Sequence, residues 1–227
     1  MRRGRTLSEL AWPKTTEFTE VVERWRPDAA AVLMGYVWAA YDALRDGVLA
    51  RVDTTQATDD VERDVTELLH WHLEAATDSF APVRVRHAVC ERESRRPAPA
   101  QPPTYDMAFA LIANPRVMWP LEAKVLRTPG QVADYVNTFR DRFMTCLYAP
   151  YSAQGSMLAY LFSGSEEDAF AAIAAAIPCK MRPAPHASGR PHRLSSHRRT
   201  VPHGKAYPEA FVCHHLVMRM IPRPRAD

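Results

Sequence analysis

Two short apolar segments separated by an Asn-Pro turn constrain the fold of this chain more than any other feature. Residues 105–113 and 117–126 are rich in apolar residues, and Asn114-Pro115 lies between them. Turn residues between two such segments predict a β-hairpin. Facing residues of a hairpin have a constant index sum and lie about 5 Å apart. A hairpin folded about Asn114 therefore places Asp106 opposite Glu122.

Strand alternation brings the charged side chains of the second segment together. Successive side chains of a strand point to opposite faces, so Glu122 and Lys124 are expected to share one face. The opposite face is expected to be buried, and its residues are Trp119, Leu121, Ala123 and Val125, with Met107, Phe109 and Leu111 alternating in the same way on the partner strand. An acidic pair on a rigid hairpin suits a hard divalent cation, Mg²⁺ or Mn²⁺. A lysine beside that pair is placed to orient or deprotonate a bound water.

This arrangement resembles the active site of the PD-(D/E)xK nuclease superfamily, which has the restriction-endonuclease-like fold, and the resemblance covers about residues 58–220. It implies that Asp106 is the motif aspartate, Glu122 the second acidic residue and Lys124 the motif lysine. It also implies that Asp106, Glu122 and the carbonyl of Ala123 bind the metal. The proline that often precedes the aspartate is displaced, since Tyr105 directly precedes Asp106. The alternative is a surface hairpin with an ordinary Glu-Lys pair, because E-x-K alone is frequent.

The segment after the hairpin predicts a helix that begins near Thr128, with Thr128 as its cap and Pro129 in the first turn. Gln131 and Tyr135 are one helical turn apart and are expected on the same face. They resemble the Q-x-x-x-Y element of the RecB-type branch of the superfamily, which implies a role in aligning the DNA strand. The alternative is a capping box of Thr128 and Gln131, with Tyr135 in the core.

A helix is also predicted before the hairpin, at residues 60–79, from an apolar stripe of about 3.6-residue period. The superfamily usually adds an acidic residue from this helix. Glu62 lies at the edge of the stripe and is the candidate for an additional metal ligand, whereas Glu67 lies on the opposite side. Glu67 as the ligand would require the helix to rotate. The alternative role for Glu62 is a capping box with Asp59.

The remaining elements predict an α/β protein with a mixed β-sheet flanked by helices, as in the restriction-endonuclease-like fold. Residues 1–57 are expected to form an N-terminal helical extension and residues 58–221 the nuclease-like core. The predicted helices are 17–26, 29–49 and 166–177, and the further predicted strands are 83–93, 156–163 and 210–218. Residues 95–103, with their prolines, predict a loop.

A basic segment, about residues 180–205, contains seven Lys or Arg residues, four His and no acidic residue. We expect it to be flexible and to contact phosphates, with His197, Arg198 and Arg199 as nucleic-acid-binding residues. The alternative is a solvated loop. His197, His214 and His215 are candidate metal ligands, but neither Cys nor acidic residues accompany them at a recognised spacing, which favours a structural or phosphate-facing role. The segment resembles, faintly, a pattern in small nuclease-like proteins of bacterial antiviral systems.

Length and composition limit the classes of protein to which this chain can belong. A chain of 227 residues with 47% hydrophobic content can bury one sizeable core. The absence of an apolar run of about 18 residues and of a signal-peptide pattern predicts a cytoplasmic protein without a membrane span. The four cysteines lie far apart without C-x-x-C spacing, which argues against a zinc ribbon or a redox pair. A net charge of +3 is too small to indicate nucleic-acid binding by itself.

The sequence therefore predicts a metal-dependent nuclease that hydrolyses phosphodiester bonds, with DNA as the expected substrate. RNA stays open, because no base-reading motif is visible. A homodimer, or a role as one subunit of a defence system, is compatible with this function. The alternative is a catalytically silent, nuclease-like subunit that binds nucleic acid or a partner protein.

Overall fold

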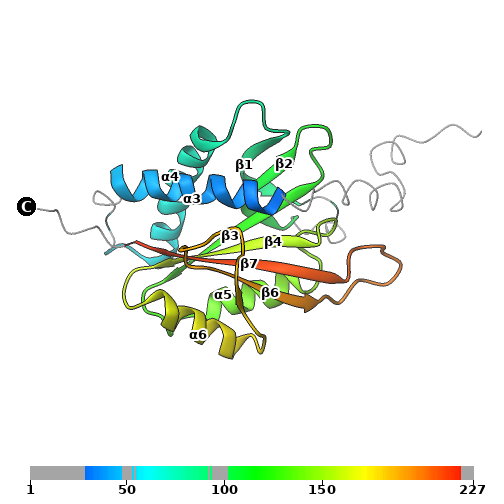
Figure 1. Cartoon of the computed structure of the whole chain (residues 1–227). Coiled ribbons are helices and arrows are strands. Elements are labelled where there is room, and N and C mark those ends of the chain that lie inside the picture. The colour runs from blue at the N-terminus through cyan, green and yellow to red at the C-terminus, as the bar shows by residue number, and fades with distance from the viewer. Residues whose placement is uncertain (1–28, 48–52, 54, 92, 94–101, 221–227) are drawn as a thin grey trace, which may run out of the picture.

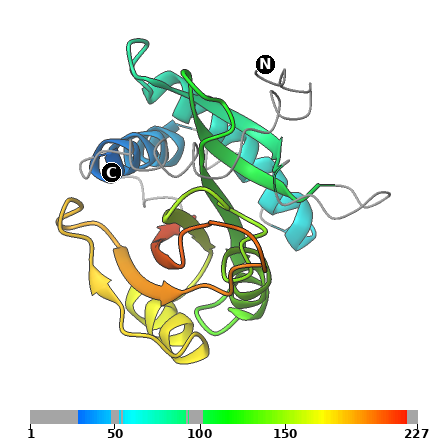
Figure 2. The ribbon, with the colours of Figure 1, turned by 90° about the vertical axis from the view of Figure 1, so that its right-hand side faces the viewer.

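One mixed sheet lies between two layers of helices in this chain, as Figure 1 shows. The computed structural model describes residues 29–47, 53, 55–91, 93 and 102–220. Helices α3 (Ala29–Gly47) and α4 (Thr58–Ala76) cover one face of the sheet. Helices α5 (Ala133–Thr138) and α6 (Glu166–Ala176) cover the other, and α5 continues into a π-helical segment, η2 (Phe139–Phe143). The view in Figure 2 shows the same separation of the helices into two layers.

Seven strands form the sheet in the order β1-β2-β3-β4-β7-β6-β5. Their bounds are β1 Val83–Cys90, β2 Thr104–Leu111, β3 Met118–Leu126, β4 Gln154–Leu161, β5 Arg182–Pro183, β6 His192–Arg198 and β7 Ala210–Arg219. The three central strands, β3, β4 and β7, are parallel to one another, and the strands on either side pair antiparallel. The chain is thus an α/β protein in which two helices precede a seven-stranded mixed sheet.

Two buried clusters stabilise this arrangement, one on each face of the sheet. The first joins α3 and α4 to Trp119, Leu121 and other inward residues of the strands, and the second joins α5, η2 and α6 to the opposite side chains. Because both faces are covered, a central strand such as β4 is buried along almost its whole length. Helix α3, which was expected in an N-terminal extension, shares the first cluster with the sheet.

The predicted hairpin is confirmed. Strands β2 and β3 pair antiparallel, with Met107 opposite Leu121 and Ala110 opposite Met118, so the index sum is the predicted one. The other predicted strands and the helices at 29–49, 60–79 and 166–177 are confirmed to within a few residues at their ends. The predicted helix at residues 17–26 and most of the loop at 95–103 lie outside the described residues.

The prediction of a flexible basic segment at residues 180–205 was wrong over much of its length. Residues His192–Arg198 form strand β6, which pairs antiparallel with β7. The strand was missed because its buried positions include His192 and Ser195, which read as loop residues in a sequence. Both side chains find hydrogen-bond partners on β7, His192 with His214 and Ser195 with His215.

Candidate active site on the hairpin

Asp106 and Glu122 lie at adjacent positions of the hairpin, as the register predicts. The paired residues of β2 and β3 end at Met107 and Leu121, so Asp106 and Glu122 occupy the next position along both strands. Asp106 Oδ2 accepts a hydrogen bond from the backbone N–H of Ala123 at 2.7 Å. This bond holds the aspartate against the residue between Glu122 and Lys124.

The backbone near Asp106 is irregular. In the pairing of β1 with β2, His87 faces Met107 and Val89 faces Tyr105, which leaves Ala88 next to Asp106 without a registered partner. Ala88 has a φ of 50°, in the left-handed region that an alanine rarely adopts. Tyr105 and Met107, two residues apart, belong to opposite buried clusters. The strand therefore twists sharply at Asp106, and such strained positions gather at functional sites.

Glu122 is a buried carboxylate that is short of partners. Its side chain is only 7% exposed, and its Oε2 has no hydrogen-bond partner among the described residues. Burial, followed by the negative charge of Asp106, raises the pKa of Glu122 from 4.5 to about 8. Burial also raises the pKa of Asp106. Two acids with raised pKa values are therefore held side by side, which is typical of a functional site.

Lys124 is the cation at the centre of the site. Its Nζ donates to Glu62 Oε1 at 2.7 Å and to the carbonyl oxygen of Ala123 at 2.6 Å, and lies 3.3 Å from Glu122 Oε1. Burial alone would lower the pKa of Lys124, but the charges of Glu122, Asp106 and Glu62 outweigh burial and raise it. Lys124 is therefore an ammonium ion at neutral pH.

Glu62 is the acidic residue that helix α4 contributes, as predicted, and Glu67 is exposed. Both oxygens of Glu62 are used: Oε1 accepts from Lys124, and Oε2 accepts from the backbone N–H of Val125 at 3.1 Å. Burial raises its pKa despite the nearby ammonium. The capping box with Asp59 is not formed, because helix α4 is preceded by Ala57 without a side-chain cap. Glu62 thus ties the N-terminal part of α4 to strand β3.

A cavity of about 330 Å³ opens beside this cluster. Glu62 and Lys124 line this cavity. Helix α5 and η2 contribute Asp134, Asn137, Thr138, Asp141 and Arg142, and the other lining residues are Thr58, Asp59 and Val125. This volume lies in the range of small-ligand sites. The site is therefore accessible from solvent on the side where Lys124 presents its ammonium group.

Two residues near the site were not predicted from the sequence. Tyr148 lies close to Glu122; its hydroxyl donates to the carbonyl of Thr104 at 2.5 Å, and burial together with the charge of Glu122 raises its pKa. Arg142 lines the cavity, with its guanidinium carbon 5.8 Å from the ring centroid of Tyr148. Arg142 belongs to η2, and its carbonyl accepts a hydrogen bond from the N–H of Tyr148 at 2.8 Å. Short π-helical segments are often found at functional sites. No sequence pattern marks such a segment.

The prediction for Gln131 and Tyr135 was wrong. Helix α5 begins at Ala133, after Val132 as an N-cap without a side-chain bond, so neither Thr128 nor Gln131 caps it. The N–H of Gln131 instead donates to the carbonyl of Thr128 at 3.1 Å, in a turn. Gln131 is exposed, whereas Tyr135 is fully buried. The two residues do not share a face, and Tyr135 cannot contact a substrate strand.

Tyr135 belongs instead to a buried polar chain. Its hydroxyl pairs with His215 Nδ1 at 2.8 Å, His215 Nε2 pairs with Ser195 Oγ at 2.6 Å, and Ser195 Oγ pairs with His197 Nε2 at 2.6 Å. Burial lowers the pKa of His215 to about 3, so the ring is neutral. This chain links α5 to β7 and β6, which explains why β6 buries polar residues.

Replacing Tyr135 with Phe is expected to lower the free energy of unfolding by about 1–3 kcal/mol, because the buried His215 Nδ1 would keep only the weak contact with the Cys213 thiol at 4.0 Å. Urea denaturation measures this change. Replacing the exposed Gln131 with Ala serves as the control and should change stability by less than about 0.5 kcal/mol. Equal effects of the two substitutions would contradict the assignment of Tyr135 to the core.

The predicted nucleic-acid-binding residues are mostly engaged within the protein. Arg199 is only 2% exposed and donates to the carbonyl oxygens of Ala149 and Pro208, so its assignment to phosphate binding was wrong. Arg198 is exposed and forms an ion pair with Glu209, with Nε 2.6 Å from Oε1. His197 is partly buried in the Ser195 chain. Among these residues Arg198 alone presents its charge to solvent.

Comparison of the chain with protein-family models, with curated proteins and with solved structures finds no match. No helix in the described ranges is both long enough and apolar enough to cross a membrane. The cysteines Cys90, Cys146, Cys179 and Cys213 are all free.

Proposed function

We propose that this protein is a metal-dependent nuclease that hydrolyses phosphodiester bonds, with Asp106, Glu122 and Lys124 as its catalytic residues. The observation that carries the proposal is the contact of Lys124 with buried carboxylates at the edge of an open cavity. The mixed sheet with an acidic hairpin and a preceding acidic helix supports the restriction-endonuclease-like resemblance. DNA is the proposed substrate, and RNA is separated from it by the experiment below.

The donor set fits a hard divalent cation, Mg²⁺ or Mn²⁺. Asp106 and Glu122 would hold it, since such ions take oxygen ligands and keep several waters. The carbonyl oxygen of Ala123 would bind it in place of the hydrogen bond that it accepts from Lys124. The buried, unpartnered Oε2 of Glu122 is the orphaned acceptor that a cation would satisfy. When bound, the metal would lower the pKa of a coordinated water and offset charge that develops on the phosphate.

Lys124 acts in this proposal as a donor rather than as a base. Its raised pKa keeps the proton on Nζ at neutral pH, so the ammonium cannot deprotonate a water. It can stabilise the negative charge that develops on the phosphoryl oxygens, which is the role of a preorganised donor in a partly dry site. Arg142, across the cavity, supplies a second cation that would bind a substrate phosphate.

Glu62 is a positioning residue in this proposal, and not a metal ligand. Its two oxygens are occupied by Lys124 and by the N–H of Val125. Among the residues that the structure describes, these three acidic side chains also do not form a compact group. One oxygen from each of Asp106, Glu122 and Glu62 does not lie within 4.8 Å of the other two. Glu62 therefore acts on the reaction by holding the ammonium of Lys124.

Incubation of the purified chain with single-stranded, duplex and structured DNA and with RNA tests this function. Cleavage of at least one substrate is expected with Mn²⁺ or Mg²⁺ and not with EDTA, and the substrate preference separates DNA from RNA. The Asp106→Asn variant should be inactive, whereas Asp46→Asn, at an exposed carboxylate of α3 away from this cavity, should remain active. Cleavage that persists in Asp106→Asn would overturn the proposal.

The Glu62→Gln variant is expected to lose about 10–100-fold in kcat, the range seen when a group that orients a site is removed. The KM for the nucleic acid should stay unchanged, because Glu62 positions Lys124 and does not bind substrate. Glu67→Gln, on the exposed side of the same helix, is the matched control and should retain full activity. A rise in KM with an unchanged kcat would contradict a positioning role.

A further inference from the structure

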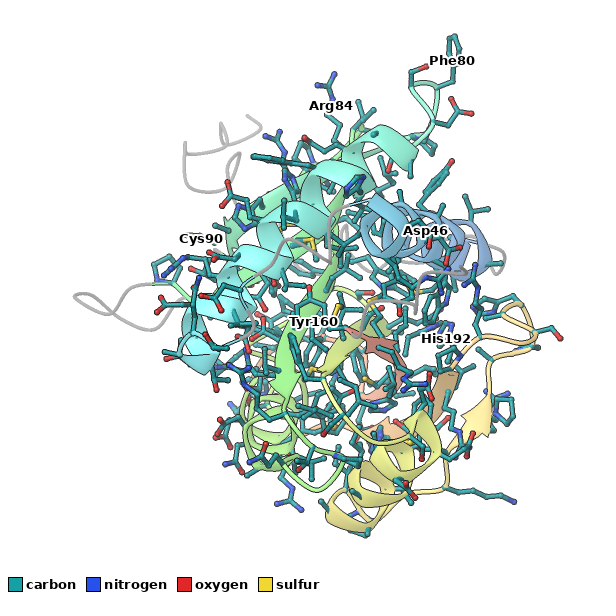
Figure 3. All side chains as sticks on the ribbon, turned by 90° about the vertical axis from the view of Figure 1, so that its left-hand side faces the viewer. Asp46, Phe80, Arg84, Cys90, Tyr160 and His192 are labelled. Atoms are coloured by element: carbon teal, nitrogen blue, oxygen red, sulfur yellow. The ribbon has the colours of Figure 1, made fainter. Side chains whose placement is uncertain are left out.

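Three histidines from separate segments meet on the α3 side of the sheet. His186 lies in the loop between β5 and β6, His192 begins β6, and His214 lies on β7. One nitrogen from each ring lies within 4.8 Å of the other two. In the part of the chain that the structure describes, this is the only set of three His, Cys, Asp or Glu side chains that is so compact. Figure 3 shows His192 below α3, near the loop that precedes β6.

The inner pair already has nearly the spacing of two metal ligands. His192 Nε2 lies 3.0 Å from His214 Nδ1. Two nitrogens bound to a tetrahedral Zn²⁺ at 2.0–2.1 Å are about 3.3 Å apart. In the metal-free protein one proton lies between these nitrogens, and a metal that replaced it would bind both lone pairs with little movement of the strands.

His214 is oriented as a metal-binding imidazole usually is. Its other nitrogen, Nε2, lies 3.1 Å from the side-chain oxygen of Gln154. Because that amide oxygen accepts, the ring carries its proton on Nε2 and presents the lone pair of Nδ1 toward His192. Burial lowers the pKa of His214 to about 2 and that of His192 to about 3, so both rings are neutral.

The third histidine connects this pair to solvent. His186 is exposed and lines a cavity of about 320 Å³, together with Trp38, Asp42 and Arg190. Arg190 is paired with Asp42, so the charge of that arginine is offset at the cavity wall. The cavity provides an entry path for an ion. It also leaves room for a fourth ligand on the side of His186.

We propose that His186, His192 and His214 bind one divalent transition-metal ion, with Zn²⁺ as the best fit, and leave its fourth coordination position open to this cavity. Imidazole nitrogens suit such ions and not Mg²⁺, so this site is chemically distinct from the acidic site on the hairpin. Three protein ligands with an open position are typical of zinc sites that bind water or a substrate. On binding, the ring proton of His192 moves from Nε2 to Nδ1, so both rings bind the ion as neutral imidazoles through the nitrogens that face each other.

Binding should also change the environment of Trp38. Its Nε1–H donates to His192 Nδ1 at 3.5 Å, the longest hydrogen bond of the cluster. When Nε2 of His192 holds the metal, Nδ1 carries the ring proton and can no longer accept this bond. Tryptophan fluorescence is therefore expected to change as Zn²⁺ is added, and the change should be absent from the Trp38→Phe variant.

The test is a zinc titration of the full chain after removal of metals, with a competing chromophoric chelator as the reporter. One Zn²⁺ per chain is expected, and Co²⁺ in its place should give the absorption bands of a tetrahedral site. The titration is made in the Asp106→Asn background, which removes a ligand of the acidic site. The result therefore does not depend on whether the protein is a nuclease.

The His186→Ala variant is expected to weaken zinc binding by more than about 100-fold. Removal of a residue that only orients a metal ligand costs up to about that much, and His186 is itself a ligand in this proposal. His186 is exposed, so this variant should fold normally, and its melting temperature without metal should match that of the wild type. His203→Ala, at another exposed histidine, is the control and should bind zinc as the wild type does. No zinc binding in the wild type, or equal affinity in His186→Ala, would overturn the proposal.

Discussion

Replacing Lys124 with Ala is expected to reduce metal-dependent cleavage by about 10²–10³-fold, the cost of removing one preorganised donor from a transition state. The ammonium of Lys124 is fixed by Glu62 and by the carbonyl of Ala123, and it stays charged because its pKa is raised. The loss should appear in kcat, since the donor acts on charge that develops during the reaction. Single-turnover cleavage of the preferred substrate measures it.

Lys180→Ala, at an exposed lysine outside the site, is the matched control and should retain activity. Removing Lys124 also leaves Glu122 and Glu62 without their nearest cation, so melting curves must accompany the activity measurements. They should be recorded at pH 6, where the raised pKa of Glu122 keeps its carboxyl protonated. Full activity in Lys124→Ala, or wild-type cleavage that persists in EDTA, would rule out the mechanism.

The hairpin and its acidic pair could be predicted because they depend on local information. The Asn114-Pro115 turn fixes the index sum, and the index sum fixes which residues face each other. The placement of Glu62 was predictable for a similar reason, since the apolar stripe of α4 determines which side of the helix faces the sheet. In both cases the periodicity of the chain specifies the geometry of the site.

The errors arose where tertiary contacts override local pattern. The turn at Pro129-Gly130 delays the start of α5 to Ala133, which separates Gln131 from the face of Tyr135. Tyr135 is then buried by its bond to His215, which is 80 residues away in the chain. A four-residue motif cannot contain that information.

Strand β6 and the histidine trio were missed for a related reason. A strand with buried polar residues has no apolar alternation, so its sequence resembles a loop. His192 and His214 meet because β6 and β7 pair in a register that places Leu194 opposite His214 and His192 opposite Leu216. His186 joins them only through the loop before β6. The three residues have no spacing that a metal motif would recognise.

The stability of the metal-free protein is expected to fall as the pH rises from 7.5 to 8.5, and Mg²⁺ should offset this fall. Glu122 has a pKa of about 8 when folded and an ordinary value of 4.5 when unfolded. Between these values the folded state binds more protons than the unfolded state, so stability decreases with pH. Over this range the loss is at most about 1 kcal/mol, or roughly 2–4 °C in melting temperature for a chain of this size.

The range must start near pH 7.5 because the buried histidines act in the opposite direction at lower pH. Burial lowers the pKa of His192, His214 and His215, so they contribute stability that is lost as the pH falls through the ordinary value of 6.5. At pH 6.5 an unfolded histidine is still half protonated. From about pH 7.5 these rings are nearly neutral in both states, and the carboxylates of the hairpin determine the slope.

Glu122→Gln isolates this effect, because a glutamine keeps the shape of the side chain and cannot ionise. Its melting temperature should change little between pH 7.5 and 8.5, and Mg²⁺ should not raise it. In the wild type Mg²⁺ should raise the melting temperature more at pH 8.5 than at pH 7.5, since a ligand that binds the ionised native site stabilises that state. Glu67→Gln should reproduce the wild-type profile. A wild-type slope that survives in Glu122→Gln would assign the pH dependence to other groups, and a Mg²⁺ effect that survives in it would exclude the acidic pair as the metal site.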